Sequence, residues 1–216
     1  MQWFLEKSAK ILGKTHDILN NYCELPTNYG KDFFQRDNVN DTKQYYSNML
    51  NQAAEQNNKS LISLLEERLK HLSRVSSFDI DAGRLTYLNS HGDFWISQII
   101  VKDADLTVID WTSACKLPAC LEVIMSYTTS AVQCKDGKID SEGLKRYINH
   151  YSEYSHLSDY DIKIMPYLYY YQQIMCHYPP PYDNIPVVYK PICTFINNFT
   201  SWLHENAGIL SEKLLT

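Results

Sequence analysis

The chain has 216 residues and a formal net charge of −5, and 44% of its residues are hydrophobic. A chain of this size fits one folded unit, residues 1–216, and its negative charge balance excludes a basic surface field for nucleic acid or anionic membranes. The apolar runs are too short to cross a bilayer and no N-terminal signal pattern is present, so we expect a cytoplasmic protein.

The first part of the chain predicts three helices. Apolar residues recur every three or four positions over residues 3–23 and, more strongly, over 60–76. Residues 42–55 show a similar pattern. Pro26 and Gly30 mark the loop that follows the first of these helices.

Beyond this point the pattern changes from helix to strand. LTYLNS, residues 85–90, predicts a short strand. SQIIV (97–101) and LTVIDW (106–111) are rich in β-branched residues, and the turn sequence KDAD joins them. We expect this hairpin to be the only well-defined β region.

The rest of the chain predicts four more helices. Pro118 suits the first turn of one helix, and Asp140 or Ser141 suits the cap of the next. Ser158 followed by Asp161 resembles a capping box, and the last helix lies near the C-terminus. The predicted fold class is therefore α+β and mostly helical, with about seven helices and a small β-hairpin.

The hairpin carries two aspartates that are candidates for catalysis. Asp93 precedes its first strand and Asp110 follows its second, so the returning chain brings both to the same end. Two carboxylates with a nearby amide suit Mg²⁺, and one of them can instead accept a proton from an attacking hydroxyl. That division of roles is the phosphoryl-transfer arrangement. Taken alone, Asp93 after His-Gly is also a common turn residue.

HGDFWISQIIV followed by LTVIDWTSA resembles the catalytic loop and metal-binding strand of the aminoglycoside phosphotransferase and choline kinase family. KILGKTHDIL, LPACLEV and LSDYDIKIMPYLYYYQQ resemble helices of the same family, in the same order. The resemblance spans roughly residues 5–205. It implies a protein kinase-like fold, with Mg²⁺ and ATP as cofactors.

The resemblance also assigns roles to individual residues. It makes Asp93 the catalytic base and His91 the residue that shapes the loop around it. Asp110 and Gln98 take the positions of the metal ligands, and Ile100 takes the position of the apolar floor beneath the adenine.

Three positions depart from the family pattern. Gln98 replaces the usual Asn, which keeps the amide oxygen but adds a methylene group. Trp95 stands where many members have a polar residue. Leu121 and Glu122 occupy the place of the usual Asp in the Pro-x-x-Asp segment.

The sequence shows no pattern typical of the nucleotide-binding half of this family's fold. No two of the seven glycines have G-x-G spacing, and only helices are predicted before the hairpin region. We therefore predict a C-terminal helical lobe without its N-terminal nucleotide lobe, related to ATP-dependent O-kinases of aminoglycosides, choline or sugars and incomplete alone. The alternative is a non-catalytic, pseudokinase-like binding module for a small ligand or a protein partner.

A lobe of this kind exposes the surface that a nucleotide lobe would cover. We expect Trp3, Phe4 and Leu5, together with Ile99 or Ile100, to form an apolar face. Such faces are usually covered by a partner, so a homodimer or a separately encoded partner is expected. The sequence predicts no binding to nucleic acid or to a membrane.

Overall fold

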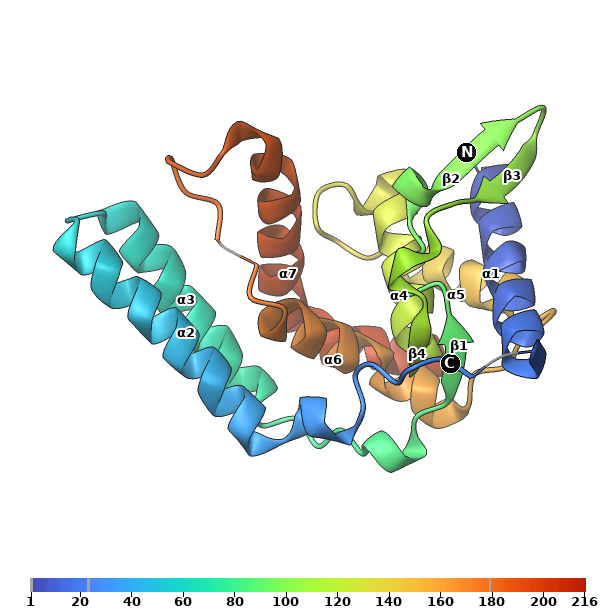
Figure 1. Cartoon of the computed structure of the whole chain (residues 1–216), viewed down its shortest axis with the longest axis horizontal. Coiled ribbons are helices and arrows are strands. Elements are labelled where there is room, and N and C mark those ends of the chain that lie inside the picture. Colours follow the sequence, from blue (N-terminus) through green and yellow to red (C-terminus); the bar gives the residue numbers. More distant parts are fainter. Residues whose placement is uncertain (1, 23, 179) are drawn as a thin grey trace.

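A computed structural model describes residues 2–22, 24–178 and 180–216. Helices dominate this part of the chain (Figure 1). They are α1 (Gln2–Tyr22), α2 (Arg36–Glu55), α3 (Lys59–Val75), α4 (Ala119–Ser130), α5 (Ser141–Tyr151), α6 (Asp159–Met175) and α7 (Lys190–Leu215).

The strands form two separate antiparallel pairs. β2 (Ile99–Lys102) and β3 (Asp105–Val108) make the predicted hairpin. β1 (Tyr87–Ser90) pairs with β4 (Cys115–Pro118), so the expectation of a single β region is wrong. β4 has only four residues and no alternating pattern. It is a strand because its backbone bonds to β1 on one side and to the loop at Pro26 on the other, where Lys116 N donates to the Pro26 carbonyl at 2.8 Å.

Most helix boundaries follow their sequence signals. The helix predicted over 3–23 is α1, and Cys23 lies outside the described residues. The helix predicted over 42–55 begins earlier, at Arg36, and forms an antiparallel hairpin with α3 at the left of Figure 1. The capping box is present: Ser158 Oγ accepts from Asp161 N at 3.1 Å, and the Asp161 carboxylate accepts from Ser158 N at 2.9 Å.

α1 lies on the side of the molecule away from the α2–α3 hairpin and packs against β1, α4 and α5 (Figure 1). Gly13 permits its close approach to α5, because a Cβ there would lie 2.5 Å from the Tyr151 carbonyl oxygen. The start of α1 also contacts the β2–β3 turn, where Lys7 Nζ donates to the Ala104 carbonyl at 2.6 Å. The core that follows from this packing includes buried residues from all seven helices.

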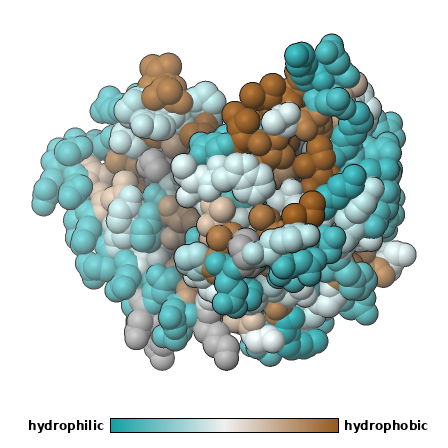
Figure 2. Space-filling view, turned by 45° about the vertical axis from the view of Figure 1, so that its right-hand side comes forward, coloured by the Kyte–Doolittle hydropathy of each residue, from teal (hydrophilic) through white to brown (hydrophobic). Residues whose placement is uncertain are grey.

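The apolar face predicted around the hairpin is only partly present. Trp3 is 44% exposed and Ile100 is 51% exposed, as expected. Phe4 is only 6% exposed, so its assignment to this face is wrong: it lies on the side of α1 that faces the core. Figure 2 shows hydrophobic surface gathered near the upper edge of the molecule in that view.

None of the helices in the described ranges is long and apolar enough to cross a membrane.

Candidate functional site

Asp93 and Gln98 are in direct contact in the loop between β1 and β2. Gln98 Nε2 donates to Asp93 Oδ2 at 3.2 Å. A short 3-10 turn, Ile96–Gln98, folds the chain back so that two residues five positions apart meet. Trp95 N donates to the Asp93 carbonyl at 3.0 Å and Gln98 N donates to the Trp95 carbonyl at 2.9 Å, which fixes that turn.

Asp110 lies at the same end of the hairpin. The residue before it, Ile109, donates its N–H to the Gln98 carbonyl at 2.9 Å. Asp110 has a φ of 60°, a left-handed conformation that Asp tolerates better than most residues. Its Oδ1 accepts from the Thr112 hydroxyl at 2.6 Å. Asp110 is therefore beside the Asp93–Gln98 pair and is held by its own turn.

His91 links the two segments and is completely buried. Its Nε2 donates to the Ile109 carbonyl at 2.9 Å, and its Nδ1 accepts from Asp93 N at 3.3 Å. One neutral tautomer satisfies both bonds, because one ring nitrogen donates while the other accepts. His91 therefore joins the backbone at Asp93 to the backbone at Ile109.

The two carboxylates have different electrostatic environments. Burial raises the pKa of Asp93; the Gln98 hydrogen bond and the Trp95 side chain partly oppose that shift, whereas the charge of Asp110 adds to it. Hydrogen bonds from Thr112 lower the pKa of the exposed Asp110. These environments move the two pKa values in opposite directions. Such a difference suits the carboxylate with the raised pKa to proton transfer and the carboxylate with the lowered pKa to binding a cation.

A buried network supports the loop from the other side. Glu122 of α4 is 1% exposed and its Oε1 accepts from the backbone N–H of Gly92. Its Oε2 accepts from His16 Nε2 of α1 at 2.7 Å, and His16 Nδ1 lies 2.8 Å from the Tyr151 hydroxyl of α5. No sequence signal connected Glu122 with His16.

Gly92 is required by the geometry of this loop. Its φ is +82°, and a Cβ at this position would lie 2.0 Å from the Ser113 carbonyl oxygen. We expect Gly92→Ala to lower stability by more than about 1 kcal/mol and to displace the Asp93 loop, because both the backbone angle and the space are unsuitable. Thermal unfolding and amide chemical shifts measure these two effects.

The matched control is Gly30→Ala. Gly30 has a φ of −72°, and its added Cβ would make an ordinary contact at 3.5 Å with Thr27. Equal losses of stability in the two variants would contradict the role assigned to Gly92.

A small cavity of about 70 Å³ opens beside Asp93. Trp95 lines it, and its buried Nε1 is near enough to lower the pKa of Asp93 but makes no hydrogen bond of normal geometry among the residues described. The remaining lining is largely aromatic and aliphatic and includes Phe94, Met125, Tyr169, Tyr178, Ile192 and Ile196. A carboxylate and an indole N–H in an apolar enclosure are features of a small-molecule site.

A wider hollow of about 620 Å³ adjoins this cavity, because Thr129 and Phe195 line both. It lies between the end of α4 and the start of α7. Lys135 and Lys190 are the charged residues in its lining, which contains no acid. Together the two hollows extend from Asp93 to an outer part, here called the mouth, that is lined by Lys135 and Lys190.

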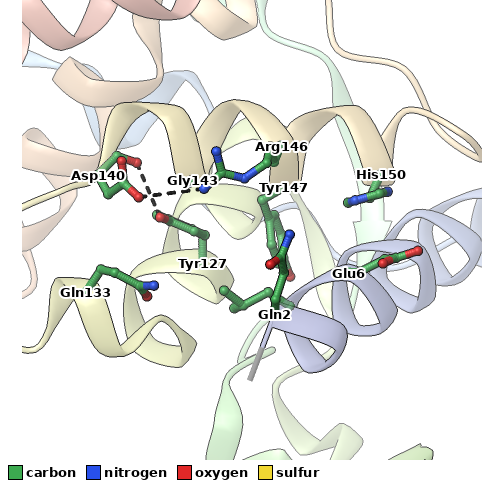
Figure 3. A pocket seen from close by; sticks show the side chains of 10 residues that line it. Gln2, Glu6, Tyr127, Gln133, Asp140, Gly143, Arg146, Tyr147 and His150 are labelled. Atoms are coloured by element: carbon green, nitrogen blue, oxygen red, sulfur yellow. Dashed lines mark hydrogen bonds and ion pairs between the residues drawn. The ribbon is translucent and has the colours of Figure 1, made fainter.

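A different cavity, of about 100 Å³, lies between α1 and α5 (Figure 3). Polar side chains surround it, among them Glu6, Tyr127, Arg146 and His150. No residue of the predicted site lines it, so it is separate from the Asp93 loop.

The donor set near Asp93 is compatible with a magnesium ion only if further ligands complete its shell. The described ranges contain no group of three or more His, Cys, Asp or Glu residues that would hold a metal ion. Asp110 offers a carboxylate, and Gln98 offers an amide oxygen, since its amide nitrogen is the atom that contacts Asp93. Because Mg²⁺ usually takes one or two carboxylates and completes its shell with phosphates and water, these ligands are compatible with it.

Ile100 is on β2, opposite Thr107 in the register, and its side chain is exposed. It therefore lies on the hairpin that begins immediately after Gln98, a few residues from the Asp93 loop.

No protein-family model matches the sequence. A comparison with curated proteins also gives no match. Among solved structures, the chain is similar to that of the amicoumacin kinase hAmiN in complex with AMP-PNP, Ca²⁺ and Ami, with a TM-score of 0.55 and 8% sequence identity. The match covers 93% of this chain and 59% of that kinase chain. At this identity the similarity concerns the fold, which is kinase-like.

Proposed function

We propose that the chain is the C-terminal, helical lobe of a kinase-like phosphotransferase that transfers the γ-phosphoryl group of ATP to a hydroxyl of a small molecule. The observation that carries the proposal is the hydrogen-bonded Asp93–Gln98 pair, which lies at the same end of the hairpin as Asp110 and beside a cavity. The kinase-like fold of the similar structure supports it.

In this proposal Asp93 is the general base. An acceptor hydroxyl in the adjoining cavity donates its proton to the Asp93 carboxylate as its oxygen attacks the γ-phosphorus of ATP. The bond from that phosphorus to the β,γ-bridging oxygen breaks, and ADP leaves with the electron pair. Gln98 fixes the carboxylate and His91 fixes the loop. A magnesium ion held by Asp110 and Gln98 would neutralise charge on the phosphates, and Ile100 would contact the adenine.

The charges around the two hollows favour a neutral or anionic acceptor. Asp93 is the acidic residue in their lining, whereas Lys135 and Lys190 lie at the mouth. A polycationic aminoglycoside or choline would meet like charge there, while a sugar, a polyol or a hydroxylated acid would not. Phosphorylation assays with a panel of these acceptors at millimolar Mg-ATP, read by mass spectrometry, test both the activity and this ranking.

We expect only weak binding of Mg-ATP to the chain alone. It spans 59% of the similar kinase, and its strands are limited to two small sheets in the described residues, so one face of the nucleotide would lack contacts. Calorimetry measures the affinity. A dissociation constant in the low micromolar range corresponds to a binding free energy of about −8 kcal/mol. Such tight binding would contradict the assignment of the chain to one lobe.

A second candidate function is a non-catalytic binding module. It is favoured by Gln98, whose amide nitrogen is engaged with Asp93 and whose longer side chain departs from the kinase pattern. A ligand of the acceptor panel that raises the unfolding temperature without being phosphorylated would support this second function over the first.

The exposed apolar residues give a prediction about assembly. We propose that a second copy of the chain or a separate partner covers Trp3, Ile100 and their neighbours. Light scattering is expected to give a mass above the 25.2 kDa of one chain, and Trp3→Glu with Ile100→Glu should restore the single-chain mass. A wild-type chain that stays monomeric and soluble at high concentration, with no partner, would count against a covered face.

A further inference from the structure

Arg68 is buried on the inner face of α3 without a partner. Its side chain is 1% exposed. Nε, Nη1 and Nη2 are all buried, and none has a hydrogen-bond partner in the part of the chain that the structure describes. A guanidinium carries five N–H donors and no acceptor, and such a group is rarely buried unless it is paired.

The elements packed against Arg68 provide no counterion. The titratable groups that face it are Tyr46 of α2, Tyr170 of α6 and Cys193 of α7, and all three are neutral when protonated. Tyr46 donates its hydroxyl proton to the Ile174 carbonyl at 2.7 Å. Burial lowers the pKa of Arg68, as expected for a cation in this setting, but a guanidinium stays protonated in proteins.

A second unpartnered nitrogen lies one turn further along the same face. His71 is 5% exposed and its Nε2 has no hydrogen-bond partner among the described residues. Burial and the charge of Arg68 lower the pKa of His71 to about 4, so the ring is neutral at physiological pH. Its Nδ1 contacts the Tyr170 hydroxyl, which leaves Nε2 available as a donor or acceptor.

The acid whose charge acts on Arg68 is on α3 itself. Glu67 is half exposed, with Oε1 located 3.6 Å from His71 Nε2 and 3.4 Å from the Ser201 hydroxyl of α7. It forms no ion pair with Arg68 in the described structure. The seam between α3, α6 and α7 therefore contains more buried donors than acceptors, and the guanidinium at its centre has no ion pair among the described residues.

We propose that Arg68, with His71 beside it, binds a small oxyanion, either a carboxylate or a phosphate-type group, in the seam between α3, α6 and α7. A water molecule must donate as well as accept, whereas an oxyanion only accepts, and a guanidinium binds its two oxygens in parallel. Arg68 does not line the cavity beside Asp93, so this site does not depend on the proposed phosphoryl transfer.

The test follows thermal unfolding in increasing phosphate, sulfate or malonate at constant ionic strength. At an anion concentration about 100 times the dissociation constant, the wild-type unfolding temperature should rise by roughly 5–10 °C. Arg68→Met, which keeps the volume and removes the charge, should show no rise. Arg74→Met removes an exposed arginine of the same helix and should behave like the wild type.

The response to each anion identifies the ligand class. A rise with phosphate and sulfate alone indicates a phosphate-type group, and a rise with malonate alone indicates a carboxylate. A wild-type protein indifferent to all three anions, or an equal rise in Arg68→Met, would overturn the proposal. If Arg68→Met does not fold, Arg68→Lys is used instead, and titration calorimetry measures its affinity for the anion. Lysine keeps the charge but loses the two parallel N–H donors of the guanidinium, so binding should weaken at least tenfold. Equal affinity in Arg68→Lys and the wild type would refute the site.

Discussion

Replacing Asp93 with Asn is expected to lower the rate of phosphoryl transfer by roughly 10²–10⁴-fold, the usual contribution of a general base. Asn keeps the shape of the side chain but does not accept the proton of the acceptor hydroxyl. The rate is measured as phosphorylated acceptor per unit time at millimolar Mg-ATP. Asp105→Asn is the matched control, because the Asp105 side chain is 91% exposed on the hairpin and outside the site. Equal rates in wild type and Asp93→Asn would contradict the role of Asp93.

The same variant should have a pH-dependent effect on stability. The pKa of Asp93 is raised in the folded state, so its stabilising contribution is complete below the unfolded-state pKa of about 3.9 and is lost as pH rises through the folded-state value. Asn has no charge to lose. The difference in unfolding temperature, Asp93→Asn minus wild type, should therefore be more positive at pH 7 than at pH 3. The opposite trend would mean that ionised Asp93 is stabilised in the fold.

Removing Glu122 is expected to have the largest effect on stability. Glu122→Ala deletes two hydrogen bonds made by a buried carboxylate, to His16 and to Gly92. It leaves the Gly92 N–H without its acceptor and leaves His16 Nε2 with only the Ser90 hydroxyl, at 3.1 Å. Hydrogen bonds to charged groups contribute about 1.5–3 kcal/mol each, so we expect a loss of roughly 3–5 kcal/mol. Chemical denaturation measures this loss. The Asp93 loop should also become disordered in amide spectra, because Glu122 holds the Gly92 backbone.

Glu142→Ala is the control for Glu122→Ala. Glu142 lies on α5 with its side chain 67% exposed, and its replacement should change stability by less than about 0.5 kcal/mol. If Glu122→Ala were as mild as this control, the buried network would not support the loop. A large loss of stability without any change in the amide spectra of the loop would mean that Glu122 stabilises the fold but does not position the Asp93 loop.

The local parts of the fold could be predicted from the sequence. Periodic apolar residues predicted the helices, and Ser158 with Asp161 predicted a capping box that is present. The hairpin followed from two β-branched runs and a turn signal. β4 was missed because its four residues form a strand only through bonds to β1 and to the loop at Pro26, and a local pattern carries no information about such distant pairing.

The candidate site was also predictable only in its local part. Asp93 and Gln98 meet because a short turn separates them, and His91 binds the adjacent backbone. His16 and Glu122 are far apart in the sequence and come together only when α1 packs against α4, so their contact had no sequence signal. Arg68 was equally hidden: it belongs to the charged run Glu66–Glu67–Arg68, which is typical of a solvated helix face, yet its side chain is only 1% exposed.

The most direct test of the account is the position of a metal-bound nucleotide on the chain. Manganese is paramagnetic and broadens the amide signals of nearby residues, so Mn²⁺ with AMP-PNP can be located even when it binds weakly. We predict broadening centred on residues 92–98 and 109–112, at millimolar nucleotide, that is lost in Asp110→Asn. Broadening confined to another surface, or unchanged in Asp110→Asn, would contradict the assignment of this hairpin as a phosphotransfer site.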